Sequence, residues 1–263
     1  MTLDVIIATY KPEGIRRLAE MELPEMENVN YIISWQAHEN YPFPASLQRK
    51  DIRICRLDGI GLSRNRNNAI AQSKADIVYI ADDDIKIMPN SLATIIRRFE
   101  ENPDTDLATF RINESLKKKY PDKTVDLSYG LPPGYYVSSI ELAFRRGIFP
   151  KIKFNENFGI NSGLFELGED ELFHLQARKS GLKCRFFPDL IASHPHESTG
   201  SRFINNPKVL HGMGAVVTKS YPRSFLFRIP LKAYRLTKNR QTRFFTALHH
   251  LFVGSIKSYK IKL

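Results

Sequence analysis

Three consecutive carboxylates, Asp82, Asp83 and Asp84, directly follow the apolar run Ile77–Ala81. That run has the length and the β-branched and aromatic content of a buried strand. Adjacent ionised carboxylates repel one another, so a divalent cation or several hydrogen-bond donors would stabilise them. Their hard oxygen atoms suit magnesium or manganese. Because open α/β sheets bind ligands at the carboxyl ends of their strands, the triplet predicts a metal-dependent site there.

The triplet Asp82–Asp84 and a second acidic cluster, Glu169–Glu171, also have a structural interpretation. Asp82–Asp84 could form a solvated turn that caps the helix expected near Asn90, because Asp is frequent in turns and at helix N-caps. The second group, Glu169–Glu171, opens an expected helix that continues to Arg178. Acidic residues in a first helical turn complement the helix dipole. The residue pattern alone leaves the structural and the functional interpretation open for both groups.

Alternating strands and helices are expected to position these residues. Apolar runs predict strands at Leu3–Ala8, Tyr31–Trp35, Ile52–Leu57 and Ile77–Ala81. Helical patterns lie at Ile15–Met21, Leu62–Ser73 and Asn90–Glu101. This alternation predicts βαβ units with a parallel sheet, in the manner of a nucleotide-binding half-domain. Further strands are expected at Leu107–Ile112, Val137–Phe144 and Leu190–Ala192, with a long polar loop at Asn113–Gly134 of the kind that often binds ligands.

The composition indicates a folded protein with a substantial core. With 263 residues, 42% hydrophobic and 25% charged, the chain fits one domain with an appendage and not a disordered segment. Cys55 and Cys184 lie far apart without metal-type spacing, which favours core thiols in a reducing compartment. The first residues lack the pattern of a signal peptide, and no window approaches about 18 apolar residues. We therefore expect a cytoplasmic protein without a spanning helix.

The net charge of +11 is concentrated at the end of the chain. After Glu197 there are thirteen Lys and Arg residues and no Asp or Glu. We expect residues 219–263 to form a basic amphipathic extension, whose apolar residues at helical spacing include Phe244, Leu248, Leu251 and Phe252. Such segments can lie in an anionic membrane interface without spanning it. This predicts a peripheral protein on the inner face of the cell membrane.

Two alternatives for the basic extension remain open. It could be a helix packed on the catalytic core with its cations simply solvated. It could also bind nucleic acid, because basic residues with interleaved aromatics can contact phosphates. No recognisable nucleic-acid module accompanies it, and we expect no nucleic-acid partner.

Four motifs occur in a fixed order: the strand Val5–Tyr10, then Gly61–Asn65, Asp82–Asp84 as a DxD motif, and Gly168–Asp170 as an ED motif. In these motifs the chain resembles the family 2 glycosyltransferases of the GT-A fold, of the bacterial surface-polysaccharide type, over about residues 3–200. The resemblance implies an α/β fold with a Rossmann-like mixed sheet flanked by helices, to which the charge pattern adds a basic C-terminal helical extension. It implies a GT-A catalytic domain at 1–218, with a nucleotide-binding half at 1–105 and an acceptor half at 106–218, before the extension at 219–263.

The resemblance also implies the residues that bind the nucleotide. Thr9 and Tyr10 would line the pocket, with Arg64 and Asn65 near the base or the diphosphate. Arginine at a helix start suits a diphosphate, although a solvated helix face is the alternative for Arg64 and for the neighbouring Arg66. Many relatives carry an acidic residue after the second strand. Here the segment is Trp35-Gln36-Ala37-His38, which makes Gln36 the candidate for base recognition.

The metal ligands are implied in the same way. Asp84 would bind Mn²⁺ or Mg²⁺ between the two phosphates of a nucleotide-sugar. Asp82 would contact the ribose or the metal, and Asp83 would help to seat the nucleotide. His194, which follows the expected strand Leu190–Ala192, is the third ligand candidate, with His196 as its alternative.

The implied reaction is transfer of a hexosyl group, most readily from a UDP-sugar, to a lipid-linked or polysaccharide acceptor. Asp170 would be the general base that deprotonates the acceptor hydroxyl, and Glu169 would orient the acceptor or Asp170. One base and one stabilised leaving group suffice for a single displacement with inversion. A metal-dependent phosphohydrolase or nucleotidyltransferase that uses the three aspartates is the alternative enzyme class.

Overall fold

The computed structural model describes residues 1–39, 41–114, 118–194, 206–239 and 241–262. The chain divides into two compact units. The first contains Met1–Ile60, Arg64–Lys153 and Gln176–His196, and the second contains Gly61–Ser63, Phe154–Leu175 and Glu197–Leu263. This division differs from the predicted boundaries at 105 and 218, because residues 154–175 and the segment before 219 belong to the same unit as the basic tail.

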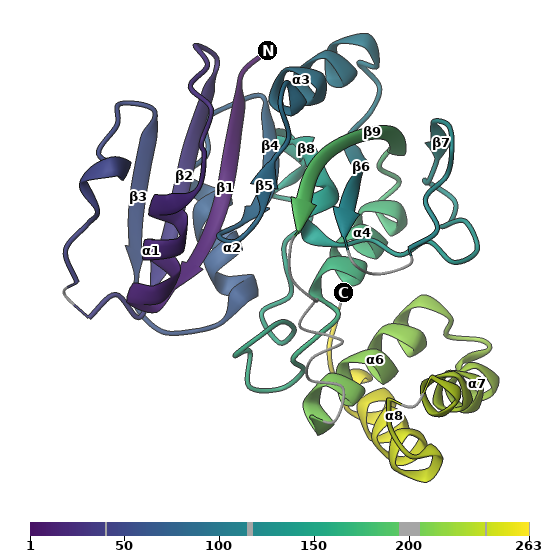
Figure 1. Cartoon of the computed structure of the whole chain (residues 1–263). Coiled ribbons are helices and arrows are strands. Elements are labelled where there is room, and N and C mark those ends of the chain that lie inside the picture. Colours follow the sequence, from purple (N-terminus) through teal and green to yellow (C-terminus); the bar gives the residue numbers. More distant parts are fainter. Residues whose placement is uncertain (40, 115–117, 195–205, 240, 263) are drawn as a thin grey trace. The chain divides into compact units, whose positions relative to one another are not determined.

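A mixed sheet forms the centre of the first unit (Figure 1). Its strands are β1 Leu3–Tyr10, β2 Val29–Gln36, β3 Ile52–Leu57, β4 Ile77–Asp82, β5 Lys86–Ile87, β6 Leu107–Glu114, β7 Val125–Asp126, β8 Leu142–Arg145 and β9 Cys184–His194. They follow the order β3-β2-β1-β4-β8-β6-β9-β5, with β7 paired to β9. Strands β1 to β4 are parallel, β8 is antiparallel to β4 and β6, and β6 is parallel to β9. The carboxyl ends of β1, β2, β4, β6 and β9 therefore share one edge of the sheet, here called the carboxyl edge.

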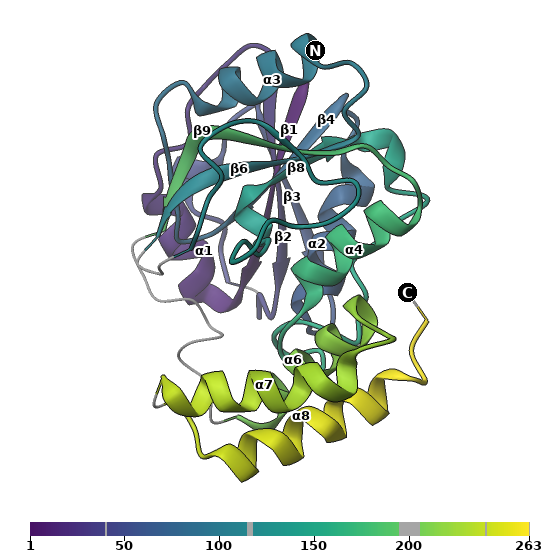
Figure 2. The same cartoon turned by 90° about the vertical axis from the view of Figure 1, so that its right-hand side faces the viewer.

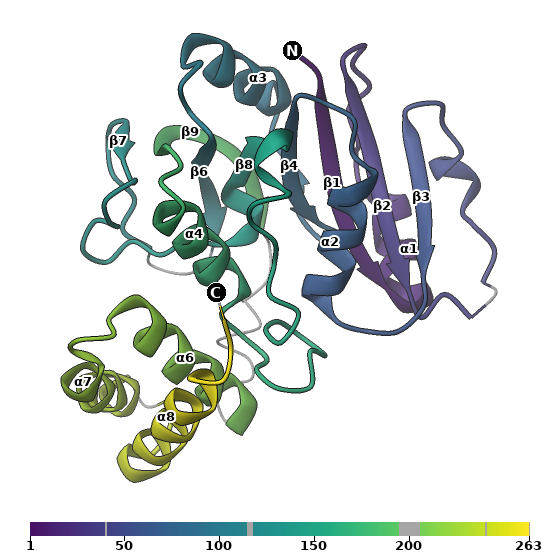
Figure 3. The same ribbon diagram turned by 180° about the vertical axis from the view of Figure 1, so that it is seen from behind.

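Helices cover both faces of this sheet. They are α1 Lys11–Glu20, α2 Leu62–Gln72 and α3 Ser91–Glu101, while α4 Glu169–Lys179 begins in the second unit and ends in the first. Helices α1 and α2 lie on opposite faces of strands β1 to β3, as a comparison of Figures 1 and 3 shows. Alternate residues of β1 face opposite sides, and Leu3, Val5 and Ile7 join the apolar residues of α1 and α3 in one core cluster. The fully buried strand explains why its sequence is a continuous apolar run.

The predicted strand Val137–Phe144 is wrong over its first half. Residues Ser139–Glu141 form a short 3₁₀ helix, and only then does β8 begin. The reason is local, because Ser138 and Glu141 form a capping box in which each side chain accepts from the other's backbone N–H. The expected polar loop also contains the short strand β7, which pairs with β9.

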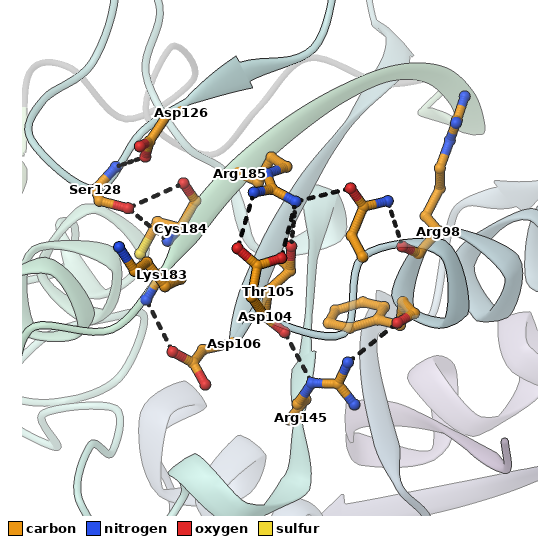
Figure 4. Close-up of polar contacts among 12 residues, drawn as sticks. Arg98, Asp104, Thr105, Asp106, Asp126, Ser128, Arg145, Lys183, Cys184 and Arg185 are labelled. Carbon is orange, nitrogen blue, oxygen red and sulfur yellow. Dashed lines mark hydrogen bonds and ion pairs between the residues drawn. The ribbon is translucent and has the colours of Figure 1, made fainter.

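A polar cluster at the amino ends of β6 and β9 fixes their register (Figure 4). The Arg185 guanidinium of β9 donates to Thr105 Oγ1 at 3.0 Å and to Asp104 Oδ2 at 3.2 Å. Arg145 of β8 donates through Nε to the Thr105 carbonyl oxygen at 2.9 Å. Three neighbouring strands are thus tied to the turn before β6. From there the pairing of β6 with β9 runs on to His194, with register shifts around Arg111 that interrupt the regular ladder.

The second unit contains α6 Pro207–Ser220 and, in the basic extension, α7 Phe225–Lys238 and α8 Phe244–Ser258 (Figure 2). Glycines allow α6 and α8 to approach closely. A Cβ atom at Gly214 would lie 2.0 Å from the Leu251 carbonyl oxygen, and one at Gly254 would lie 2.0 Å from the His211 carbonyl oxygen. The unit therefore has a packing interface that admits no side chain at these positions.

The apolar residues of the tail pack inside this unit. A cluster joins the three helices through Leu210, Ile229, Ala233, Leu236, Ala247 and Leu251. Phe244, Leu248 and Phe252 are partly buried against it. The apolar residues that helical spacing marked on 244–258 therefore pack at least partly against the other two helices of this unit. Within the described residues, no helix is both long and apolar enough to cross a membrane.

Candidate active site

The carboxyl edge brings together most of the predicted donor-site residues of the first unit. Strand register places Ala8 opposite Asp82 and Tyr10 opposite Gln36. The ends of β1, β2 and β4 therefore lie next to one another, as expected for the ligand edge of an open α/β sheet. Asn65 of α2 joins them, because its Nδ2 donates to the Thr9 carbonyl oxygen at 2.9 Å.

Asp83 points into the fold. Thr9 Oγ1 donates to its Oδ2 at 2.5 Å, and Arg17 of α1 donates to its Oδ1 at 2.8 Å. The residue is 8% exposed, and burial raises the pKa of its carboxyl group, although the Thr9 and Arg17 hydrogen bonds act in the opposite direction. A solvated turn is therefore excluded for Asp83, and the N-cap of α3 is Asn90 instead. The middle aspartate links β1, α1 and β4, and its predicted nucleotide contact stays a prediction.

Asp82 is held by an arginine that the sequence motifs did not single out. Arg66 of α2 is 2% exposed and donates to Asp82 Oδ1 at 3.0 Å and to Ser139 Oγ at 2.7 Å. The solvated-face alternative is therefore wrong for Arg66 and fits Arg64, which is exposed. Helical spacing could have indicated that Arg66 is buried, because Arg66 shares a helix face with the buried residues Ala69 and Ile70 at i+3 and i+4.

Asp84 and His194 meet at the carboxyl edge. Antiparallel pairing of Lys86 with Ser193 carries β9 back along β5, so the residues beyond this pair lie close together. His194 Nε2 is 3.4 Å from Asp84 Oδ1, and both side chains are largely but not fully buried. The structure thus brings together two of the three predicted metal ligands. The alternative ligand His196 lies outside the described residues.

These donors are of the chemical class that a hard divalent cation requires. Asp82 and Asp84 offer carboxylate oxygens, and His194 offers an imidazole nitrogen that manganese accepts. Among the described residues, no group of three or more His, Cys, Asp or Glu side chains is arranged to hold a metal ion. The donor chemistry fits a cation, and the metal assignment stays a prediction.

Two buried amides near the end of β1 have hydrogen-bonding atoms left over. Within the described part of the chain, Gln36 Nε2 and Asn65 Oδ1 are buried without a hydrogen-bond partner. Each residue is 2% exposed. Unpaired buried polar atoms are costly, so one donor and one acceptor at a strand end indicate a place that a ligand completes. Tyr10 is half-buried beside Gln36 in the register of the sheet.

The predicted catalytic carboxylates lie in the second unit. Glu169 and Asp170 begin α4, directly after Gly168, whose φ of +105° is accessible mainly to glycine. Glu169 is buried, and a Cβ atom at Gly159 would lie 3.4 Å from its carboxyl carbon. Asp170 is half-buried. Both carboxylates gain from the dipole of α4, so the structural role predicted for this turn is compatible with a chemical one.

A buried ion pair anchors the loop that precedes β8. Lys118 and Glu141 form a pair whose side chains are 0% exposed. Tyr120 and Tyr135 donate their hydroxyl groups to the Glu141 carboxylate at 2.5 and 3.0 Å. The expected polar loop is therefore tied to the sheet by a charged interior contact. Sequence reasoning missed this network because its members are brought together only by the tertiary fold.

Comparisons with known proteins identify the family. The profile of Glycosyl transferase family 2 matches residues 34–166, half of the chain. No curated protein matches the sequence.

Solved structures share the fold. S. aureus TarS 1-349 superposes with a TM-score of 0.60 at 15% identity, covering 99% of this chain and 89% of that chain. The same protein in complex with UDP gives a TM-score of 0.57 at 16% identity, with coverages of 99% and 89%. Its complex with UDP-GlcNAc gives 0.54 at 15% identity, with coverages of 99% and 90%. With half of its length matched by the family profile and its architecture shared with these structures, the chain belongs to glycosyl transferase family 2 and is a glycosyltransferase of the GT-A fold.

Proposed function

We propose that this glycosyltransferase moves a hexosyl group from a UDP-sugar to a lipid-linked or polysaccharide acceptor, with inversion at the anomeric carbon. The observation that carries this proposal is the 3.4 Å approach of His194 to Asp84 at the carboxyl edge, next to the end of β4 at Asp82. That edge is where open α/β sheets bind nucleotides. A diphosphate donor needs such a set of cation ligands because negative charge accumulates on the departing nucleoside diphosphate.

A uracil base could form hydrogen bonds with the unpaired amide atoms of Gln36 and Asn65 beside β1. Uracil carries an imide N–H between two carbonyl groups, so it offers both a donor and acceptors. Gln36 Nε2 has a free donor position and Asn65 Oδ1 a free acceptor position among the described residues. Cytosine has an acceptor nitrogen in place of the imide N–H and could donate to the Asn65 oxygen only through its exocyclic amino group, so it would need a different position in the site. Complexes of S. aureus TarS with UDP and UDP-GlcNAc are compatible with this choice of base.

A divalent cation, Mn²⁺ or Mg²⁺, is the proposed cofactor. Asp84 and His194 would hold it, with Asp82 as a further oxygen ligand kept in place by Arg66. When bound, the cation supplies Lewis-acid stabilisation of the diphosphate leaving group. Arg66 itself is buried and limits the rotation of Asp82, so the carboxylate is oriented before the donor arrives.

The proton chemistry is assigned to the start of α4. Asp170 takes the proton from the acceptor hydroxyl as that oxygen attacks the anomeric carbon and the bond to the diphosphate breaks. Glu169, buried against Gly159, is a positioning residue for Asp170 or the acceptor. No enzyme nucleophile takes part in a single displacement, so the product has inverted configuration.

The basic tail supports an acceptor at a membrane surface. Thirteen cationic residues and no acidic ones follow Glu197. The cytoplasmic leaflet carries anionic lipids, and each nearby Lys or Arg contributes about 1 kcal/mol to binding. Peripheral association there would bring the enzyme to a lipid-linked acceptor.

The proposed donor can be tested with purified protein and a panel of nucleotide-sugars, each with Mn²⁺ or Mg²⁺. A donor that binds the native state raises the unfolding temperature. We expect UDP-sugars with a cation to give the largest shift. Asp84→Ala should lose most of this cation-dependent shift, whereas Asp84→Ala with an undiminished shift would refute the metal assignment.

The catalytic base is tested separately by product analysis. Asp170→Asn should abolish release of UDP and of glycoside while leaving the donor-induced thermal shift nearly unchanged. Near-normal turnover of Asp170→Asn would refute the assignment. Release of sugar phosphate or pyrophosphate by the wild type, instead of nucleoside diphosphate and glycoside, would refute the reaction class.

A further inference from the structure

Helix α7 has apolar residues on two sides. Its inner side, Ile229, Ala233 and Leu236, belongs to the core of the second unit. A second set is exposed to solvent: Phe227 at 82%, Leu231 at 47% and Tyr234 at 57%. Packing of the unit explains the inner set but gives no reason for the outer one.

The outer residues form one continuous stripe. Their positions follow i, i+4 and i+7, which places them on one side of a helix with 3.6 residues per turn. The buried residues Ile229, Ala233 and Leu236 lie on the opposite side of the same helix. The stripe, here called the outer α7 stripe, is therefore a face that the three-helix core leaves to solvent. Exposed apolar stripes on soluble proteins mark interaction surfaces.

The charges around the stripe select its partner. Arg228 and Arg235 are exposed on one flank of the helix, and Lys238 is exposed at its end. No acidic residue occurs anywhere after Glu197. An apolar face whose charged neighbours on α7 are all cations is complementary to an anionic lipid surface, where the apolar side chains enter the interface and the cations meet the head groups. A second copy of the chain would bring the same positive charges into opposition.

We propose that the outer α7 stripe, formed by Phe227, Leu231 and Tyr234, is the surface that enters an anionic membrane interface. This inference rests on the peripheral association included in the proposed function, and it assigns that association to α7. The apolar residues of α8 that helical spacing suggested, such as Leu251, pack inward instead. The helix would lie in the plane of the interface, with its inner side still bound to α6 and α8.

The test is co-sedimentation of the full chain with vesicles of phosphatidylcholine alone or mixed with phosphatidylglycerol. Wild type should bind the anionic vesicles, and high salt should weaken binding because surface charges are screened. Phe227→Ser combined with Leu231→Ser should weaken binding at least about tenfold, since each side chain gains when it leaves water. Arg228→Gln combined with Arg235→Gln should weaken it about thirtyfold, at about 1 kcal/mol per cation.

Phe245→Ser is the matched control. Phe245 lies on α8 and is 80% exposed, so its loss removes the same side chain at nearly the same exposure outside the stripe. We expect Phe245→Ser to bind vesicles like the wild type. An equal loss of binding in Phe245→Ser and in Phe227→Ser would overturn the assignment to α7. All these positions are exposed, so unfolding curves should stay close to the wild type.

The outcomes separate this inference from the proposed function. Undiminished vesicle binding by both α7 double variants would overturn the α7 assignment while keeping the membrane association. No binding by the wild type would overturn both, although the donor-induced thermal shift would still report nucleotide-sugar binding. A concentration-dependent dimer in light scattering that the Phe227→Ser and Leu231→Ser double variant abolishes, without vesicle binding, would assign the stripe to self-association instead.

Discussion

Glu141→Gln should destabilise the first unit, because it removes the counter-charge that the structure shows for a fully buried ammonium. Both side chains of the Lys118–Glu141 pair are 0% exposed. Lys118 would keep Ser138 Oγ at 3.2 Å and the ring of Tyr136, whose centroid is 4.2 Å from Nζ. These neutral contacts do not replace a carboxylate.

The size of the effect follows from the two ways in which the protein can respond. Leaving one partner of a buried ion pair uncompensated costs about 3–5 kcal/mol. The protein can also release the lysine proton, and neutralising a lysine of ordinary pKa about 10.4 at pH 7 costs about 4.6 kcal/mol. We therefore expect a loss of about 3–4.6 kcal/mol at pH 7. At pH 9 neutralisation costs only about 1.9 kcal/mol, so the loss should shrink, because the unfolded state then binds more protons than the folded state.

Urea unfolding followed by tryptophan fluorescence measures this loss. Trp35, the single tryptophan, is buried in β2 and reports on the first unit. Glu101→Gln is the surface control, since its contact with Arg98 at 3.2 Å is exposed and should be worth less than about 1 kcal/mol. Adding Lys118→Met to Glu141→Gln should recover most of the stability. A loss below about 1 kcal/mol in Glu141→Gln, or the same loss at pH 7 and pH 9, would refute the reasoning.

Three other changes test the described contacts. Thr9→Val removes a 2.5 Å hydrogen bond to the Asp83 carboxylate and should lower the free energy of unfolding by about 1.5–3 kcal/mol, measured by tryptophan fluorescence; an unchanged midpoint would contradict the structural role of Asp83. Gly254→Ala places a Cβ atom 2.0 Å from the His211 carbonyl oxygen and should lower helical stability in far-ultraviolet circular dichroism by about 1–3 kcal/mol, and wild-type stability would rule out the close approach. Burial, with the positive field of neighbours such as His250, lowers the pKa of His211 to about 4. The stability from neutral His211 should be complete above about pH 6.5 and should fall by on the order of 2–3 kcal/mol toward pH 4. His211→Gln should flatten this pH dependence, and an equally steep variant curve would exclude His211 as its source.

The sequence was most informative where burial is two-sided. Strands such as Leu3–Tyr10 and Ile77–Asp82 are covered on both faces, so their continuous apolar runs predict them. The carboxyl ends of these runs in turn indicate where the candidate site lies. The resemblance also named Asp84 and His194 together, and the structure places them 3.4 Å apart. Each of these predictions depends on a pattern of neighbouring residues, and such a pattern can be recognised in a single sequence.

Other features depend on contacts between distant segments. The insertion of β8 between β4 and β6 follows from no periodicity in Leu142–Arg145, and a capping box shortens that strand. Helical spacing groups Arg66 with Ala69 and Ile70, but the contacts of its guanidinium with Asp82 and Ser139 form only when α2 packs on the sheet. The inward packing of α8 likewise depends on glycines in two helices that meet only after folding.

The pairing of β9 has a consequence for the order of folding during synthesis. Strand β9 lies between β6 and β5, and its last residue, His194, completes the pair with Asp84. When β4 and β5 have been synthesised, Asp84 is therefore already present, but β9 with His194 is not. Domains fold largely in the order in which they emerge, so β1 to β4 can assemble early while Asp84 still lacks the histidine. The nascent chain thus acquires this pair only when nearly the whole first unit has been synthesised.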